Sequence, residues 1–181
     1  MQSTLTQWTV EDYHRMINAG ILDDRRVELL AGEIHTMVPE SPEHTYRGET
    51  LADRLRKSLR DRAYLREARP ITLANSEPEP DIAIARGSRS DYATRHPNGS
   101  DLLLVIEISN TTLRTDLTKK RDLYASAGIH EYWVVDLQDR CFVIFREPDG
   151  TTYRQQQTVT DEPIAPIAFP DITIPLREIL S

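Results

Sequence analysis

The sequence predicts an α/β fold in which helices pack against a mixed sheet. Leucines at every fourth position mark an amphipathic helix over residues 44–62. The run Leu102–Ser109 is almost continuously apolar, as in a central strand that is covered on both faces. Several shorter runs rich in aromatic and β-branched residues, separated by turn residues, supply the other strands.

The 181 residues suffice for a sizeable core, and no repeat or composition shift marks a boundary, so we expect a single domain over residues 1–181. With 39% hydrophobic and 28% charged residues, the chain is not predominantly disordered. No apolar run approaches about 18 residues, and residues 1–9 lack signal-peptide character, so a cytoplasmic protein is expected. The single cysteine, Cys141, excludes an internal disulfide and is expected to be a buried, inert thiol.

The N-terminal part predicts a helix followed by a hairpin. The helix spans residues 9–19, because Thr9 is a good N-cap and Gly20 supplies a stop. Residues 26–30 and 33–38 form the hairpin, with Ala31 and Gly32 at its turn. The amphipathic helix comes next, and it packs through Leu51, Leu55 and Leu59.

Strands are expected over residues 65–73, 81–85 and Leu102–Ser109. The polar stretch 86–101 between the last two is longer than ordinary connections, so we expect weak order there. A helix over residues 115–127 leads to the strand Glu131–Asp136. A C-terminal hairpin then pairs residues 141–146 with 151–157.

The net charge of −7 argues against a protein that coats nucleic acid through bulk positive charge. Residues 44–69 nevertheless carry eight basic and four acidic side chains, a local charge of +4. A solvated helix face is the ordinary interpretation of this segment, and a phosphate-facing surface is the alternative.

Three side chains are expected to meet at one sheet edge. Asp81 opens a strand, and Glu107 lies near the end of the next, so antiparallel pairing brings them together. Lys120 lies within the first two turns of the following helix and shares a face with Leu117 and Tyr124. Lys119 shares a face with Leu123 and could reach Asp116, so it remains a second candidate.

Glu107 is the strongest signal, because a carboxylate within an apolar strand is costly unless it is paired or binds a cation. A salt bridge to Lys120 is one explanation. The other is a magnesium ion held by Asp81 and Glu107, since a divalent cation keeps two converging carboxylates ionised. Lys120 would then orient a water nucleophile or stabilise charge on phosphate.

These motifs together resemble the PD-(D/E)XK nuclease superfamily, specifically its bacterial branch of restriction-endonuclease relatives often called the Uma two family. Each motif is short, but their order and spacing are fairly specific over about residues 8–136. The matching residues are Val27-Glu28-Leu29-Leu30-Ala31-Gly32-Glu33-Ile34, His44, Pro80-Asp81, Glu107-Ile108-Ser109, Asp116, Lys120, Tyr124, Gly128 and Glu131-Tyr132-Trp133.

The resemblance implies a restriction-endonuclease-like core, with Asp81 and Glu107 as ligands of Mg²⁺ or Mn²⁺. This sequence departs from the superfamily pattern at one position. The usual lysine, two residues beyond the acid, is replaced by Ser109. Lys120 would take that role from the helix.

Glu28 is a candidate accessory catalytic acid. For both Glu28 and Glu33, however, the ordinary interpretation is a solvent-facing glutamate beside a turn. His44 is ordinarily a surface histidine at a helix terminus, and contact with substrate is the alternative. The five histidines lack metal-ligand spacing, so no zinc site is predicted.

The leading hypothesis is a magnesium-dependent endonuclease that hydrolyses DNA, with phosphate contacts from the helix that begins at His44. A homodimer is expected, because cutting both strands generally takes two active sites. The alternative is a non-catalytic interaction or assembly module that keeps the nuclease fold. A metal-free pair of carboxylates, as in glycoside hydrolysis, is a distant third hypothesis, since it gives Lys120 no role.

Overall fold

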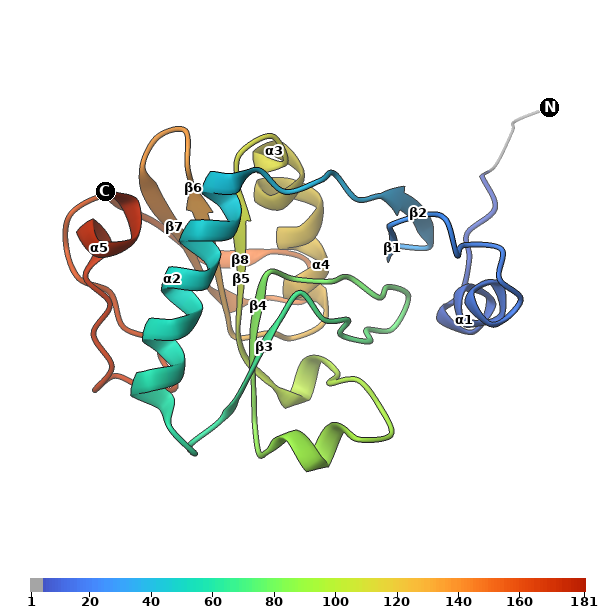
Figure 1. Cartoon of the computed structure of the whole chain (residues 1–181), viewed down its shortest axis with the longest axis horizontal. Helices are drawn as coiled ribbons and strands as arrows, with labels where there is room; N and C mark the ends of the chain where they lie inside the picture. Colours follow the sequence, from blue (N-terminus) through green and yellow to red (C-terminus); the bar gives the residue numbers. More distant parts are fainter. Residues whose placement is uncertain (1–4) are drawn as a thin grey trace.

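A computed structural model describes residues 5–181 and contains two sheets (Figure 1). The larger one has six strands in the order β3-β4-β5-β6-β7-β8, and the smaller is the hairpin β1-β2. The strands are β1 (Val27–Leu30), β2 (Glu33–Thr36), β3 (Tyr64–Glu67), β4 (Ile82–Ala85), β5 (Leu102–Ser109), β6 (Glu131–Asp136), β7 (Cys141–Pro148) and β8 (Tyr153–Val159). The α-helices are α1 (Val10–Asn18), α2 (Pro42–Leu59), α3 (Leu113–Thr115), α4 (Arg121–Ser126) and α5 (Leu176–Leu180).

The larger sheet is mixed, as predicted. Its central strands β5 and β6 pair in parallel, and every other neighbouring pair in it is antiparallel. Parallel neighbours need a crossover, which here runs through α3 and α4. All residues of β6 are buried, and so are seven of the eight in β5, because helices cover both faces of the sheet.

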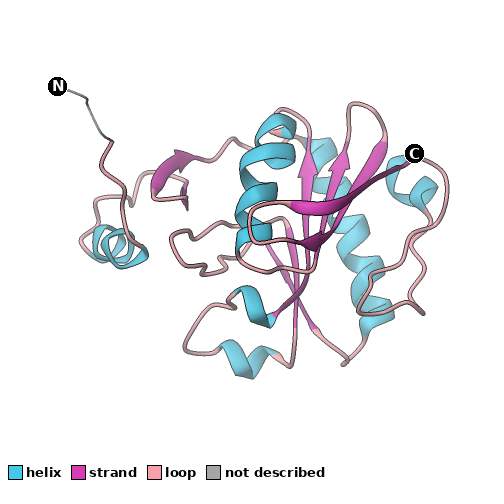
Figure 2. Ribbon diagram, turned by 180° about the vertical axis from the view of Figure 1, so that it is seen from behind, coloured by secondary structure: helices cyan, strands magenta, loops and turns pink. Residues whose placement is uncertain are grey.

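Two apolar layers hold the helices against the sheet (Figure 2). On one face, Leu51, Leu55 and Leu59 of α2 are buried against β4, β5 and β6, which confirms the predicted leucine stripe. Helix α5 completes this layer. On the other face, Tyr124 of α4 packs beside Tyr132 of β6, with ring centroids 4.9 Å apart in an edge-to-face arrangement.

The helix α1 and the hairpin β1-β2 project from the side of the sheet (Figure 1). The hairpin turns through Ala31 and Gly32, both with positive φ, which matches the right-handed twist of the strands. A Cβ on Gly32 would lie 2.8 Å from Cβ of Gln7, so this position also requires glycine for space. A backbone bond from Glu77 N–H to the Leu29 carbonyl (2.8 Å) joins the hairpin to the rest of the chain.

The crossover helix differs from its prediction. It begins at Leu113 and ends at Ser126, and residues 116–120 between α3 and α4 form a π-helical turn. π-Helical turns are rare and are found frequently at functional sites. This one contains both Asp116 and Lys120, which are buried.

Two other expectations about the fold are wrong, and one helix was not predicted. The strand β3 ends at Glu67 instead of residue 73, because Ala68 has positive φ and Pro70 cannot continue the ladder. The stretch 86–101 forms two short 3₁₀ helices, Arg89–Tyr92 and Gly99–Asp101, and its ends are joined by a backbone bond of 2.8 Å. Helix α5 was not expected.

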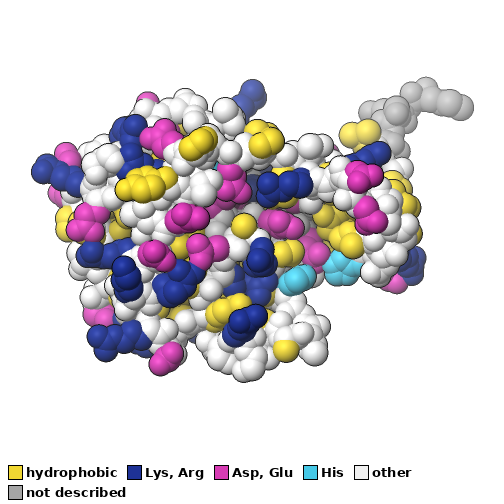
Figure 3. Space-filling view, in the orientation of Figure 1, with side chains coloured by type: hydrophobic (Ala, Val, Ile, Leu, Met, Phe, Trp, Pro, Cys, Tyr) yellow, Lys and Arg dark blue, Asp and Glu magenta, His cyan; other side chains and the backbone are white. Residues whose placement is uncertain are grey.

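Four of the eight basic side chains in the segment 44–69 form ion pairs with nearby acids. Arg54 pairs with Glu178 at 2.8 Å, and Arg62 pairs with Asp171 at 2.8 Å. Figure 3 shows acidic and basic side chains alternating over this face of the molecule. The solvated-face interpretation therefore fits the outer surface of α2. None of the helices described within residues 5–181 has the length and apolar character that crossing a membrane requires.

Candidate functional site

The candidate site lies where β4 begins and β5 ends. Ile82 pairs with Ile106 in the antiparallel register, which sets Asp81 beside Glu107. The backbone N–H of Ile108 donates to Oδ2 of Asp81 at 2.6 Å. The sequence-predicted pair therefore shares one sheet edge, although each carboxylate has its own set of partners.

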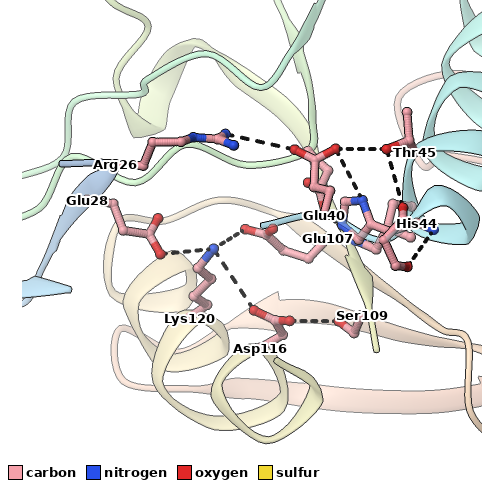
Figure 4. Close-up of polar contacts among 12 residues, drawn as sticks. Arg26, Glu28, Glu40, His44, Thr45, Glu107, Ser109, Asp116 and Lys120 are labelled. Atoms are coloured by element: carbon pink, nitrogen blue, oxygen red, sulfur yellow. Dashed lines mark hydrogen bonds and ion pairs between the residues drawn. The ribbon is translucent and has the colours of Figure 1, made fainter. Parts of the chain in front are cut away.

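Glu107 is buried in a group of polar side chains from α4 and the π-helical turn (Figure 4). Nζ of Lys120 lies 3.1 Å from Oε1, and the Tyr124 hydroxyl donates to the same oxygen at 2.7 Å. Oε2 accepts no hydrogen bond from the part of the chain that the structure describes. Glu107 therefore keeps one oxygen for a ligand in the adjoining cavity.

Lys120 contacts two further carboxylates. Its Nζ lies 3.4 Å from Glu28 of the hairpin and 4.0 Å from Asp116, one turn earlier in its own helix. Ser109 donates to the second oxygen of Asp116 at 2.7 Å. The expectation of a solvent-facing Glu28 is wrong, because the hairpin folds back and buries it against Lys120.

Asp81 has a different neighbour. His44, in the first turn of α2, lies with Nε2 3.2 Å from Oδ2 of Asp81. Its other ring nitrogen, Nδ1, lies 3.5 Å from Oε2 of Glu40. His44 is therefore half-buried within the site, where the ordinary interpretation placed it on the surface.

These groups line a cavity of about 170 Å³ with an excess of negative charge. Two permanent cations line it, Arg26 and Lys120, together with the imidazoles of His35 and His44. The carboxylates around it are Glu28, Glu40, Glu79, Asp81, Glu107 and Asp116. With all six ionised and both imidazoles neutral, the formal charge is −4, so a phosphate cannot enter favourably without added cations.

Burial and charge shift the ionisation of these groups. Burial raises the pKa of Glu107 well above its ordinary value, although the Lys120 ammonium opposes this shift. Burial also raises the pKa of Asp116. For Lys120, burial acts to lower the pKa, but the surrounding carboxylates outweigh it and raise the pKa, so this residue stays protonated.

The donor set suits a divalent cation. Carboxylate oxygens are the ligands that magnesium and manganese prefer, and Glu107 and Asp81 each have one oxygen free of protein hydrogen bonds within residues 5–181. A cation beside Glu107 would also offset the burial that disfavours its ionised form.

Sequence reasoning missed two of the acids and misplaced one lysine contact. Glu79 lines the cavity, and Glu40 approaches His44, although neither carries a periodic or motif signal. Lys119 does not reach Asp116. It pairs with Glu33 and lies 2.7 Å from His35 on β2.

Comparison with known proteins gives a consistent result for the fold and the family. Residues 10–177 match the Uma2 family, which is described as "Putative restriction endonuclease". No curated protein sequence is significantly similar to the chain.

The solved structures that are similar to the chain include the following two. One is a putative nuclease belonging to DUF820 from Anabaena variabilis, with 14% identity, a TM-score of 0.72, and coverage of 85% of this chain and 89% of that one. The other is the type IIG restriction endonuclease BpuSI, with 17% identity, a TM-score of 0.45, and coverage of 83% of this chain and 17% of that one. The first supports a restriction-endonuclease-like fold. Since the family match spans most of the sequence, the chain belongs to the Uma2 family.

Proposed function

We propose that this protein is a metal-dependent DNA endonuclease whose ion, Mg²⁺ or Mn²⁺, is held by Asp81 and Glu107. The observation that carries the proposal is the small cavity in which six carboxylates face one buried ammonium and one arginine. Such a cavity attracts cations strongly, and a phosphodiester is brought there most readily by ions that neutralise the carboxylates.

Each residue has a distinct part in this proposal. The bound ion would supply Lewis-acid activation of the phosphate and lower the pKa of a coordinated water. Lys120 keeps its proton and stabilises negative charge that develops on the phosphate. Tyr124 and Lys120 together orient Glu107, and Glu28 orients Lys120 from the hairpin.

The test is cleavage of plasmid and linear DNA with EDTA, Mg²⁺ or Mn²⁺ added in parallel. The parent protein is expected to cleave only with added metal, and Asp81→Ala and Glu107→Ala are expected to abolish cleavage while circular dichroism shows a folded chain. Glu147→Ala, on β7 outside the cavity, is the matched control and should cleave like the parent. Absence of cleavage under every metal condition would contradict the proposal.

One specific observation favours a second function. The Lys120–Glu107 contact is also what a purely structural ion pair would look like, as in a non-catalytic module on a nuclease fold. Such a module would bind no divalent ion at Asp81 and Glu107, which titration calorimetry with Mn²⁺ measures directly. The homodimer and the single domain over residues 1–181 stay predictions.

A further inference from the structure

Two arginines beside the candidate site have no acid partner. Within residues 5–181 their guanidinium groups donate only to backbone carbonyls, Arg66 to Pro70 at 3.0 Å and Arg69 to Ala68 at 2.9 Å. The backbone N–H of Ala68 donates to the carbonyl of Asp81 at 3.0 Å, which ties this segment to the site. A chain with a net charge of −7 has acids in excess, so two arginines without an ion pair call for an explanation.

Arg66, on the edge strand β3, is only 8% exposed. Its Nε is buried and has no hydrogen-bond partner among the described residues. The guanidinium lies over the ring of Tyr64, 5.8 Å from the centroid, and this ring stacks on that of Tyr92 at 6.0 Å. Burial lowers the pKa of Arg66, and the nearby Arg69 cation adds to this effect. A buried cation without an anion is costly, so an anion that reaches Arg66 is bound favourably.

Two carboxylates near these arginines leave them uncompensated. Glu67 follows Arg66 in β3, so its side chain points to the other face of the sheet, where it pairs with Arg56 of α2. Burial raises the pKa of Glu79, and the Arg69 cation only partly opposes this shift. Because Glu79 lines the candidate cavity, Arg69 lies at the margin of that cavity.

Arg66 is on the same face of the sheet as Glu107. Arg66 pairs with Ala83 of β4, and Ala83 pairs with Val105 of β5. Glu107 lies two residues beyond Val105, so the alternation of side chains puts it on that face. The separation is two strands across the sheet, about 10 Å, and two residues along it, about 7 Å. A nucleic-acid strand with one phosphate at Glu107 would therefore pass the two arginines within a few nucleotides.

We propose that Arg66 and Arg69 form a phosphate subsite that binds the sugar–phosphate backbone of the DNA strand being cut, beside the scissile phosphate. This inference rests on the proposed function, because it takes DNA as the ligand. Arg69 is exposed and meets the phosphate first. Arg66 lies behind it and uses only one of its five N–H donors within the described residues, so its guanidinium is available for phosphate oxygens. The phosphate-facing interpretation of the segment 44–69 then applies at its C-terminal end.

Fluorescence anisotropy of a short labelled DNA duplex tests the subsite. Ca²⁺ is added to neutralise the cavity, gels confirm that the duplex stays uncut, and the NaCl concentration is varied. Arg69→Gln is expected to raise Kd at least about threefold and to reduce the slope of log affinity against log salt by about 1, because one phosphate contact is lost.

Lys57→Gln is the matched control for the loss of one positive charge. Lys57 is exposed and forms no ion pair within residues 5–181, but it lies on the outer surface of α2. This variant should keep the Kd and the salt dependence of the parent. Equal effects of Arg69→Gln and Lys57→Gln, or no binding of the duplex by the parent at low salt, would overturn the inference.

Inorganic phosphate probes Arg66 without DNA. In EDTA and at constant ionic strength, replacing chloride by phosphate should raise the melting temperature of the parent more than that of Arg66→Gln. Arg66→Lys keeps the charge but loses the planar fork, so its duplex affinity should also fall. Equal phosphate effects in the parent and Arg66→Gln would overturn the inference. So would a phosphate effect that Arg66→Gln loses while its duplex Kd stays that of the parent, because the site would then hold free phosphate only. If Arg66→Gln does not fold, the same phosphate comparison is made with Arg69→Gln.

Cleavage kinetics separate this inference from the proposed function. Arg69→Gln should raise KM and leave kcat nearly unchanged, because the contact is made equally before and during the reaction. A parent that cuts DNA but binds it no more tightly than Arg69→Gln would leave the nuclease proposal standing and remove the subsite. Duplex binding that depends on Arg69, in a parent that cuts DNA under no metal condition, would do the reverse.

Discussion

Nζ of Lys120 lies 3.1 Å from Oε1 of Glu107, and both side chains are buried between the sheet and the hairpin β1-β2. A buried ion pair adds little net stability by itself, because desolvation offsets the attraction between its charges. Removing one partner is far more costly, since the other charge stays buried. The site is therefore sensitive to single substitutions in both stability and chemistry.

Lys120→Met is expected to lower the free energy of unfolding by about 3–5 kcal/mol, because Glu107, Glu28 and Asp116 lose their shared cation. Single-turnover DNA cleavage, measured well below the melting temperature, should slow by about 10² to 10³-fold. Lys119→Met is the matched control. Its partner Glu33 is exposed, so it should cost less than about 1 kcal/mol and leave the rate unchanged. Equal rate losses in the two variants would contradict a specific role for Lys120.

The raised pKa of Glu107 predicts a pH dependence of stability in metal-free buffer. Burial favours the protonated carboxyl in the folded chain, so the folded state binds more protons than the unfolded state above about pH 4.5. Stability from this group is present below that pH and is lost as pH rises through the raised pKa. Glu107→Gln removes this titrating group. The melting temperature of the variant, relative to that of the parent, should therefore increase as pH rises from 4.5 to 8. A constant difference across this range would refute the expectation.

The thiol of Cys141 should be unreactive in the native protein. It is buried on β7, and burial raises the pKa of the thiol, so little nucleophilic thiolate forms. Ellman's reagent at pH 8 is expected to modify it only after unfolding in guanidinium chloride. Rapid modification of the folded protein would show that this edge of β7 opens locally.

Local pattern was enough to predict most of the fold. The strand Glu131–Asp136 and the central strand Leu102–Ser109 have the predicted bounds, because a buried parallel pair needs continuous apolar side chains. The stretch 86–101 was predicted poorly for the opposite reason. Its order depends on contacts remote in sequence, such as Thr72 N–H bonding to the Pro97 carbonyl at 2.9 Å.

The candidate site was predictable to the extent that its residues stand out in their own segments. Glu107 does so, because it interrupts an apolar strand. Glu40 does not, because an exposed glutamate beside prolines is ordinary. Only its contact with His44 of α2 in the folded chain identifies Glu40 as part of the site. No local sequence pattern predicted the π-helical turn at residues 116–120, although this turn contains the buried side chains of Asp116 and Lys120.

Moving the lysine from the helix to the strand tests whether Lys120 substitutes for the lysine that the superfamily carries at position 109. Glu107 and Ser109 are two residues apart in β5, so their side chains share a face of the sheet. Asp116 links the two positions, since it accepts the Ser109 hydroxyl at 2.7 Å and lies 4.0 Å from Nζ of Lys120. An ammonium at position 109 would therefore enter the same group of carboxylates.

The double variant Ser109→Lys with Lys120→Ser is expected to cleave DNA at least about tenfold faster than Lys120→Ser alone. Ser109 is fully buried, so the longer side chain should cost about 1–3 kcal/mol of stability through overpacking, which the melting temperature reports. Ser109→Lys alone serves as the control for that cost. A double variant that is folded at the assay temperature but no faster than Lys120→Ser would mean that the role of Lys120 depends on its approach from the π-helical turn, and that charge in the cavity is insufficient by itself.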